Sequence, residues 1–133
     1  MSSQQKHTWF NLMVAVISIL AYFALWPLIG PWRAMGAFGL LGFAGFSVFF
    51  YLKGKKSGRV VSDERDEMIC VKALTIAQRV VWVSLIVAFL VALRFFGEDG
   101  AIPVQGLSMV VWWSFCAFIV VQSLATLILY ARQ

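Results

Sequence analysis

Long apolar segments, separated by short polar ones, set the pattern of this chain. Four of them hold 20 residues or more and few charges: residues 9–29, 33–52, 77–96 and 107–130. At a rise of about 1.5 Å per residue, an α-helix of that length reaches the ~30 Å thickness of a bilayer's hydrocarbon core. The first segment is too long for the core of a secretory signal, so we expect it to be retained. The pattern predicts four transmembrane helices in one membrane domain, residues 1–133.

Short turns are expected to connect these segments in pairs. Gly30 and Pro31 leave room only for a tight turn, and the stretch GEDGAIPVQG between the last two segments is rich in turn-forming residues. Each pair therefore predicts a helical hairpin. The predicted fold class is all-α: an integral membrane four-helix bundle made of two transmembrane hairpins, with a cytoplasmic loop and helix extension at residues 53–76.

The third helix is expected to begin before its transmembrane part. Ser62 suits the N-cap position, and the acidic residues after it lie where the positive end of the helix dipole favours carboxylates. Because neither Gly nor Pro occurs between Met68 and Phe96, one helix can run unbroken from Asp63 to Phe96, a length of about 51 Å. Its first turns should therefore extend into the cytoplasm or along the membrane surface.

Composition supports a membrane protein. With 62% hydrophobic and 13% charged residues, the chain lies far from the usual balance of a soluble domain. Eleven of the seventeen charged residues lie between Lys53 and Arg79. The net charge of +5 is expected to face the anionic inner leaflet, because the basic cluster is juxtamembrane and no nucleic-acid-binding motif accompanies it. We therefore expect no direct nucleic-acid binding.

The distribution of Lys and Arg predicts the orientation. Four spans place both termini and the middle segment on one side, which collects nine of the eleven Lys and Arg residues. By the positive-inside rule both termini are then cytoplasmic, in a multi-pass protein of a bacterial-type inner membrane. The aromatic residues predicted near the outer interface are Trp26, Trp32, Trp112 and Trp113.

Small residues concentrate in the second segment, where glycine recurs every third residue at Gly36, Gly39, Gly42 and Gly45. Small side chains allow close packing of helices in lipid, and steps of three spread around an α-helix by about 60° each. We predict packing against two neighbours within the bundle; a lipid or substrate groove and a homodimer seam are the alternatives. Gln122 is expected to bridge helices, since its amide needs a partner in lipid.

The spans offer little catalytic chemistry. No acid and no histidine lies in any of the four, which argues against a coupled pump. His7 is the only histidine, so haem held by paired histidines is excluded. Cys70 and Cys116 are expected near opposite faces of the membrane and therefore not to form a disulfide. We expect no cofactor, and an enzyme is less favoured than a non-enzymatic protein.

An acidic cluster before the third span is the remaining candidate for chemistry. Asp63, Glu67 and Cys70 fall on one helix face at spacings of four and three, and carboxylate and thiolate are competent zinc ligands. The favoured interpretation is that the carboxylates stabilise the helix start or contact a partner. Metal binding by these three residues, in a metal-dependent membrane enzyme, is the weaker alternative.

At SDERDEMICVKA the chain resembles a group of small prokaryotic four-helix membrane proteins of unknown function, which share an Asp-Glu-Arg-acid motif before the third helix. The matching residues are Asp63, Glu64, Arg65 and Asp66, followed by Ile69, Lys72 and Ala73. Some members of that group accompany helix-turn-helix transcription regulators. The resemblance therefore implies a membrane sensor or a protein that sequesters such a partner.

The sequence thus predicts a non-enzymatic inner-membrane protein with a regulatory or interaction role, acting on a cytoplasmic protein partner or on anionic lipid. A small uncoupled channel or carrier, alone or as a homo-oligomer, is the alternative. The residues predicted to contact the partner or lipid are Lys53, Lys55, Lys56, Arg59, Asp63, Glu64, Arg65, Asp66, Glu67 and Lys72.

Overall fold

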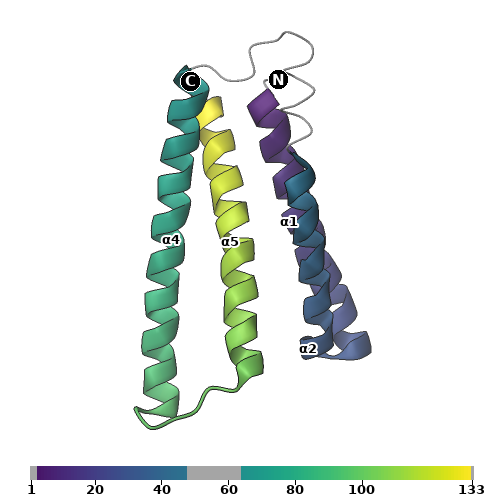
Figure 1. Ribbon diagram of the computed structural model, residues 1–133, viewed down its shortest axis with the longest axis vertical. Coiled ribbons are helices and arrows are strands. Elements are labelled where there is room, and N and C mark those ends of the chain that lie inside the picture. The colour runs from purple at the N-terminus through teal and green to yellow at the C-terminus, as the bar shows by residue number, and fades with distance from the viewer. Residues whose placement is uncertain (1–2, 48–63, 133) are drawn as a thin grey trace.

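The computed structural model describes residues 3–47 and 64–132, and its regular elements are all helical. They are α1 (Ser3–Ile29), α2 (Pro31–Ala34), η1 (Met35–Ser47), α4 (Glu64–Phe96) and α5 (Val104–Ala131). Figure 1 shows two antiparallel hairpins side by side, with the starts of α1 and α4 and the end of α5 at the same end of the molecule. For the described residues, the predicted all-α class is confirmed.

A glycine with positive φ turns the chain in each hairpin. Gly30 has φ +83° and donates its N–H to the Trp26 carbonyl oxygen at 2.9 Å, and Pro31 then begins α2. Gly97 has φ +72° and donates to the Leu93 carbonyl oxygen at 2.9 Å, which ends α4. Glycine adopts this backbone region at no steric cost, and proline suits the first position of a helix. The described residues thus form two antiparallel hairpins, and that both of them cross the membrane stays a prediction.

The return helix of the first hairpin differs from the prediction. From Met35 to Ser47 it is a 3₁₀-helix of 13 residues, where we expected an α-helix. Side chains at i and i+3 eclipse one another in a 3₁₀-helix, which limits its length. Here glycine occupies every third position from Gly36 to Gly45, so one of the three eclipsed rows has no side chains to collide. The same spacing that we expected to spread around an α-helix therefore forms a single stripe.

Three of the described helices are long and apolar enough to cross a membrane: Gln4–Ile29, Glu64–Phe96 and Val104–Ala131. The fourth predicted span, residues 33–52, is described only as far as Ser47. An α-helix rises about 1.5 Å per residue and a 3₁₀-helix about 2.0 Å. Helix α2 and η1 together therefore extend about 32 Å. A fourth crossing therefore stays a prediction, while three packed candidate spans are shown.

Helix α4 is the longest element. Its 33 residues run without a break and extend about 50 Å, which confirms the predicted continuous helix from Glu64 onward. Asp63, the predicted first residue, lies outside the described residues. Helix α4 packs against α5, α5 packs against α1, and α1 packs against η1. Contacts between α1 and α5 therefore join the two hairpins.

Aromatic rings form the centre of the contact between the hairpins. Phe38 of η1 is fully buried, and its ring centroid lies 5.2 Å from that of Tyr22 and 5.1 Å from that of Trp113. Trp112 stacks on Phe38 at 6.3 Å. Trp112 and Trp113, predicted as interfacial anchors, thus also pack against the core. Most other large apolar side chains are exposed, as expected for a surface that faces lipid.

Candidate functional site

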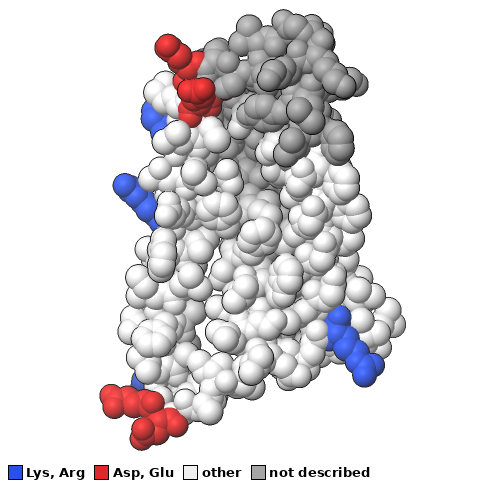
Figure 2. Space-filling view, viewed as in Figure 1, with Lys and Arg blue, Asp and Glu red and all other residues white. Residues whose placement is uncertain are grey.

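Charged side chains gather at the start of α4. Glu64, Arg65, Glu67 and Lys72 are exposed there, whereas Asp66 is half-buried. Figure 2 shows acidic side chains at both ends of the molecule, separated by a broad surface with few charges. The start of α4 therefore presents a charged patch next to an apolar body. The other predicted contact residues lie outside the described residues: Lys53, Lys55, Lys56, Arg59 and Asp63.

A hydrogen bond ties the start of α4 to the end of α5. The Tyr130 hydroxyl donates to Oδ1 of Asp66, which lies in the first turn of α4. Hydrogen bonds to ionised groups are stronger than those between neutral groups. Asp66 therefore has a structural contact that the sequence alone did not reveal, because the order of the helices was unknown. The exposed carboxylates of Glu64 and Glu67 flank this fixed point.

Of the three residues proposed as weak metal-ligand candidates, the structure describes two. Glu67 is exposed, Cys70 is half-buried, and Asp63 is not described. Among residues 3–47 and 64–132, no three His, Cys, Asp or Glu side chains are placed to hold one metal ion. The geometry that the metal hypothesis needs is therefore not shown.

A polar cavity lies between α1, α4 and α5, close to the hydrogen bond between Asp66 and Tyr130. Its volume is about 230 Å³. The lining residues are Gln4, His7, Thr8, Asn11, Cys70, Ile119, Gln122, Ser123 and Thr126. They come from the first turns of α1, the second turn of α4 and the later turns of α5. Three helices therefore enclose a polar space at the end of the bundle that carries the charged patch.

Hydrogen bonds inside the helices fix several of these polar groups. The hydroxyls of Thr8 and Thr126 each donate to the carbonyl oxygen four residues earlier, at 2.8 Å. The Asn11 side-chain amide donates to Nδ1 of His7 at 3.3 Å, so this imidazole nitrogen acts as the acceptor. The Asn11 carbonyl oxygen is buried and has no hydrogen-bond partner among the described residues.

Sequence reasoning missed this cavity although a signal was present. Gln4, His7, Thr8 and Asn11 recur at spacings of three and four, which places them on one face of α1. In a membrane helix, a polar stripe of this kind indicates that this face contacts other helices and not lipid. Gln122 joins the cavity from α5, and its predicted role in bridging helices stays a prediction.

The glycines of η1 lie on an open face. Gly36, Gly39, Gly42 and Gly45 are exposed, and a Cβ atom added at any of them would meet no described atom within 4 Å. The predicted close packing of these glycines inside the bundle is therefore not seen in residues 3–47 and 64–132. Three of the four instead line an apolar groove of about 590 Å³ beside α5, which suits lipid acyl chains. A carrier that uses this face stays a hypothesis.

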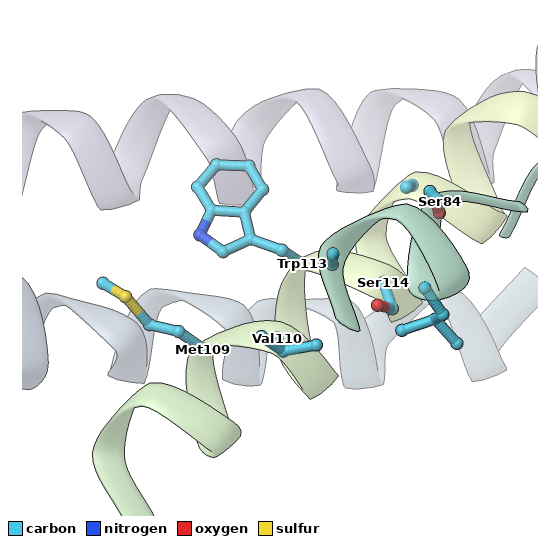
Figure 3. Close-up of a pocket in the computed structure, with 8 residues that line it drawn as sticks. Ser84, Met109, Val110, Trp113 and Ser114 are labelled. Atoms are coloured by element: carbon cyan, nitrogen blue, oxygen red, sulfur yellow. The ribbon is translucent and has the colours of Figure 1, made fainter. Parts of the chain in front are cut away.

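A second apolar groove, of about 400 Å³, lies between α4 and α5 (Figure 3). Trp113 and Met109 line it from α5, and Ser84 lines it from α4. The Ser84 hydroxyl donates to the Val81 carbonyl oxygen at 2.8 Å, so its proton is already bonded within the helix. The groove therefore offers mainly apolar contact, whereas the polar chemistry concentrates at the opposite end of the bundle.

A family model described as "Predicted membrane protein (DUF2178)" matches residues 6–133. The match includes both hairpins and the charged start of α4. No curated protein and no solved structure matches the chain. The resemblance to small membrane proteins of unknown function is confirmed at that level.

Proposed function

Because the chain belongs to this family of predicted multi-pass membrane proteins of unknown function, we propose that it is a non-enzymatic protein of a bacterial-type inner membrane that binds a cytoplasmic protein partner. The charged patch formed by Glu64, Arg65, Glu67 and Lys72 is the contact surface. One observation carries the proposal: these side chains are exposed on a helix whose start is tied to α5 by Asp66 and Tyr130. The patch is therefore held in a defined position.

The orientation supports the same conclusion. Nine of the eleven Lys and Arg residues fall on the side that would carry the charged patch and both termini, and such residues are retained in the cytoplasm. Anionic headgroups would then attract the basic residues from Lys53 to Arg59. Each basic residue that reaches the membrane surface contributes about 1 kcal/mol of binding free energy. That attraction would keep the patch close to the membrane, where a partner meets it.

Charge reversal at the patch is expected to weaken partner binding. Replacing both Glu64 and Glu67 with Lys reverses two of the four charges of the patch. A partner that complements these acids would then meet like charges, and we expect at least about tenfold lower recovery of the partner. The matched control is the double replacement of Glu98 and Asp99 with Lys, which reverses two exposed acids in the turn that follows α4. The measurement is quantitative mass spectrometry of proteins that co-purify with each variant in mild detergent. Equal recovery of every co-purifying protein with both variants would contradict the proposal.

A further inference from the structure

The polar cavity between α1, α4 and α5 has no role in the proposed partner contact. Among the described residues that line it, none is Asp, Glu, Lys or Arg, and His7 carries the only imidazole. A charged ligand would therefore find no Asp, Glu, Lys or Arg as counter-charge among these described residues, and an uncompensated charge taken out of water costs several kcal/mol. The composition of the wall thus selects a neutral ligand.

The hydrogen bonds that the wall residues already make indicate which polar groups a ligand should carry. The hydroxyls of Thr8 and Thr126 have given their protons to backbone carbonyl oxygens, so toward any other group they act as acceptors. The carbonyl oxygen of Asn11 also lacks a partner in the described part of the chain, but it is fully buried, so a ligand reaches it only after the side chain turns toward the cavity. Leaving such an atom without a donor costs about 1–3 kcal/mol. A ligand in this cavity should therefore carry hydrogen-bond donors.

The wall also contains donors and an apolar portion. The side-chain amide of Gln122 can donate, and Ile119 provides an apolar surface. The volume of about 230 Å³ leaves room for a small ligand. A hydroxyl group both donates and accepts through a single oxygen, which suits a small site that presents both kinds of group.

We propose that this cavity binds a small neutral hydroxyl-bearing group, supplied either by a free polyol or by the terminal hydroxyls of a phospholipid headgroup. Both sources share the same chemistry. The second is accessible because the cavity lies within the first turns of α1 and the last turns of α5, near the ends of two candidate spans. This proposal is independent of the partner contact, since none of the cavity residues belongs to the charged patch.

Cys70 provides a local readout, because it lines the cavity and its thiol is free and half-buried. We would measure the rate of its alkylation by iodoacetamide, resolved by peptide mass spectrometry, with added glutathione as the control for viscosity. One arm uses the protein in detergent with and without erythritol. The other compares nanodiscs of phosphatidylglycerol, whose headgroup carries hydroxyls, with nanodiscs of phosphatidylcholine, whose headgroup carries none.

Slower alkylation of Cys70 with erythritol supports a free polyol, and slower alkylation only in phosphatidylglycerol supports a headgroup. Replacing Thr126 with Val should raise the erythritol concentration for half-protection by about five- to tenfold, or remove the phosphatidylglycerol effect, because one acceptor is lost. Thr126→Ser, which keeps the hydroxyl, should retain protection. Thr75→Val is the matched control: Thr75 makes the same 2.8 Å backbone hydrogen bond but is exposed on α4.

Two results would overturn the proposal. The first is an unchanged rate for Cys70 in both arms with the unaltered protein. The second is protection that persists fully in Thr126→Val and in Asn11→Leu, since the protecting molecule would then lie elsewhere. Circular dichroism shows whether each variant folds. If Thr126→Val does not fold, the Thr126→Ser variant still tests whether the hydroxyl is sufficient for protection.

Discussion

Replacing Phe38 with Ala is expected to lower the free energy of unfolding by about 2 kcal/mol. The side chain has 0% exposure and lies among the rings of Tyr22, Trp112 and Trp113. Removing the ring empties about 100 Å³, and each Å³ of residual cavity costs about 24 cal/mol. In lipid the hydrophobic drive between helices is absent, so lost packing contacts account for most of this effect.

The matched control for this prediction is Phe43→Ala in the same helix, because Phe43 is 53% exposed and stacks only on its neighbour Phe46 among the described aromatic contacts. Its expected effect is below about 0.5 kcal/mol, as for surface substitutions generally. Reversible unfolding in mixed micelles of mild detergent and dodecyl sulfate, followed by tryptophan fluorescence, measures both variants. Equal losses would show that the aromatic cluster does not join the two hairpins.

Replacing Tyr130 with Phe is expected to lower the free energy of unfolding by about 1.5 kcal/mol. The substitution removes the hydroxyl that donates to Asp66 and leaves the rest of the ring in place. Hydrogen bonds to ionised groups contribute about 1.5–3 kcal/mol, and we expect the lower end because both side chains are only half-buried. The start of α4 should also exchange its amide hydrogens faster, because its tie to α5 is lost.

Tyr22→Phe is the control for this hydroxyl deletion. The Tyr22 side chain is 1% exposed, and its hydroxyl has no hydrogen-bond partner among the described residues. Removing an unpaired buried hydroxyl should leave the stability unchanged or raise it by about 1 kcal/mol. A double-mutant cycle of Tyr130→Phe with Asp66→Asn isolates the pair, and a coupling energy near zero would refute the interaction.

The membrane pattern of the chain could be predicted because it depends on local composition. Apolar segments of 20 residues or more, the absence of helix breakers between Met68 and Phe96, and the turn at Gly30 can each be recognised from neighbouring residues. The positions of α1, α4 and α5 follow from them, although α1 begins at Ser3, six residues before the predicted segment 9–29. The charged start of α4 was recognised for the same reason, since the acids follow a suitable N-cap residue.

The remaining features depend on which helices are neighbours, and a single sequence does not contain that information. The bond from Tyr130 to Asp66 joins residues 64 positions apart. The polar cavity combines residues of three helices, each unremarkable alone. The 3₁₀ form of η1 was missed because glycine spacing was evaluated on a helix of 3.6 residues per turn. Trp113 was assigned to the membrane interface because aromatic residues near span ends usually lie there.

The proposed partner contact requires the charged patch to face the cytoplasm, and cysteine labelling in intact cells tests this most directly. Single replacements of Glu64 and of Asp99 with Cys place an accessible thiol at the first residue of α4 and in the turn that follows α4, since both positions are exposed. A maleimide that cannot cross the membrane is applied before and after lysis, with the unaltered protein as the background. The account predicts labelling of Asp99→Cys in intact cells and of Glu64→Cys only after lysis. Labelling of Glu64→Cys in intact cells, with Asp99→Cys protected, would contradict it.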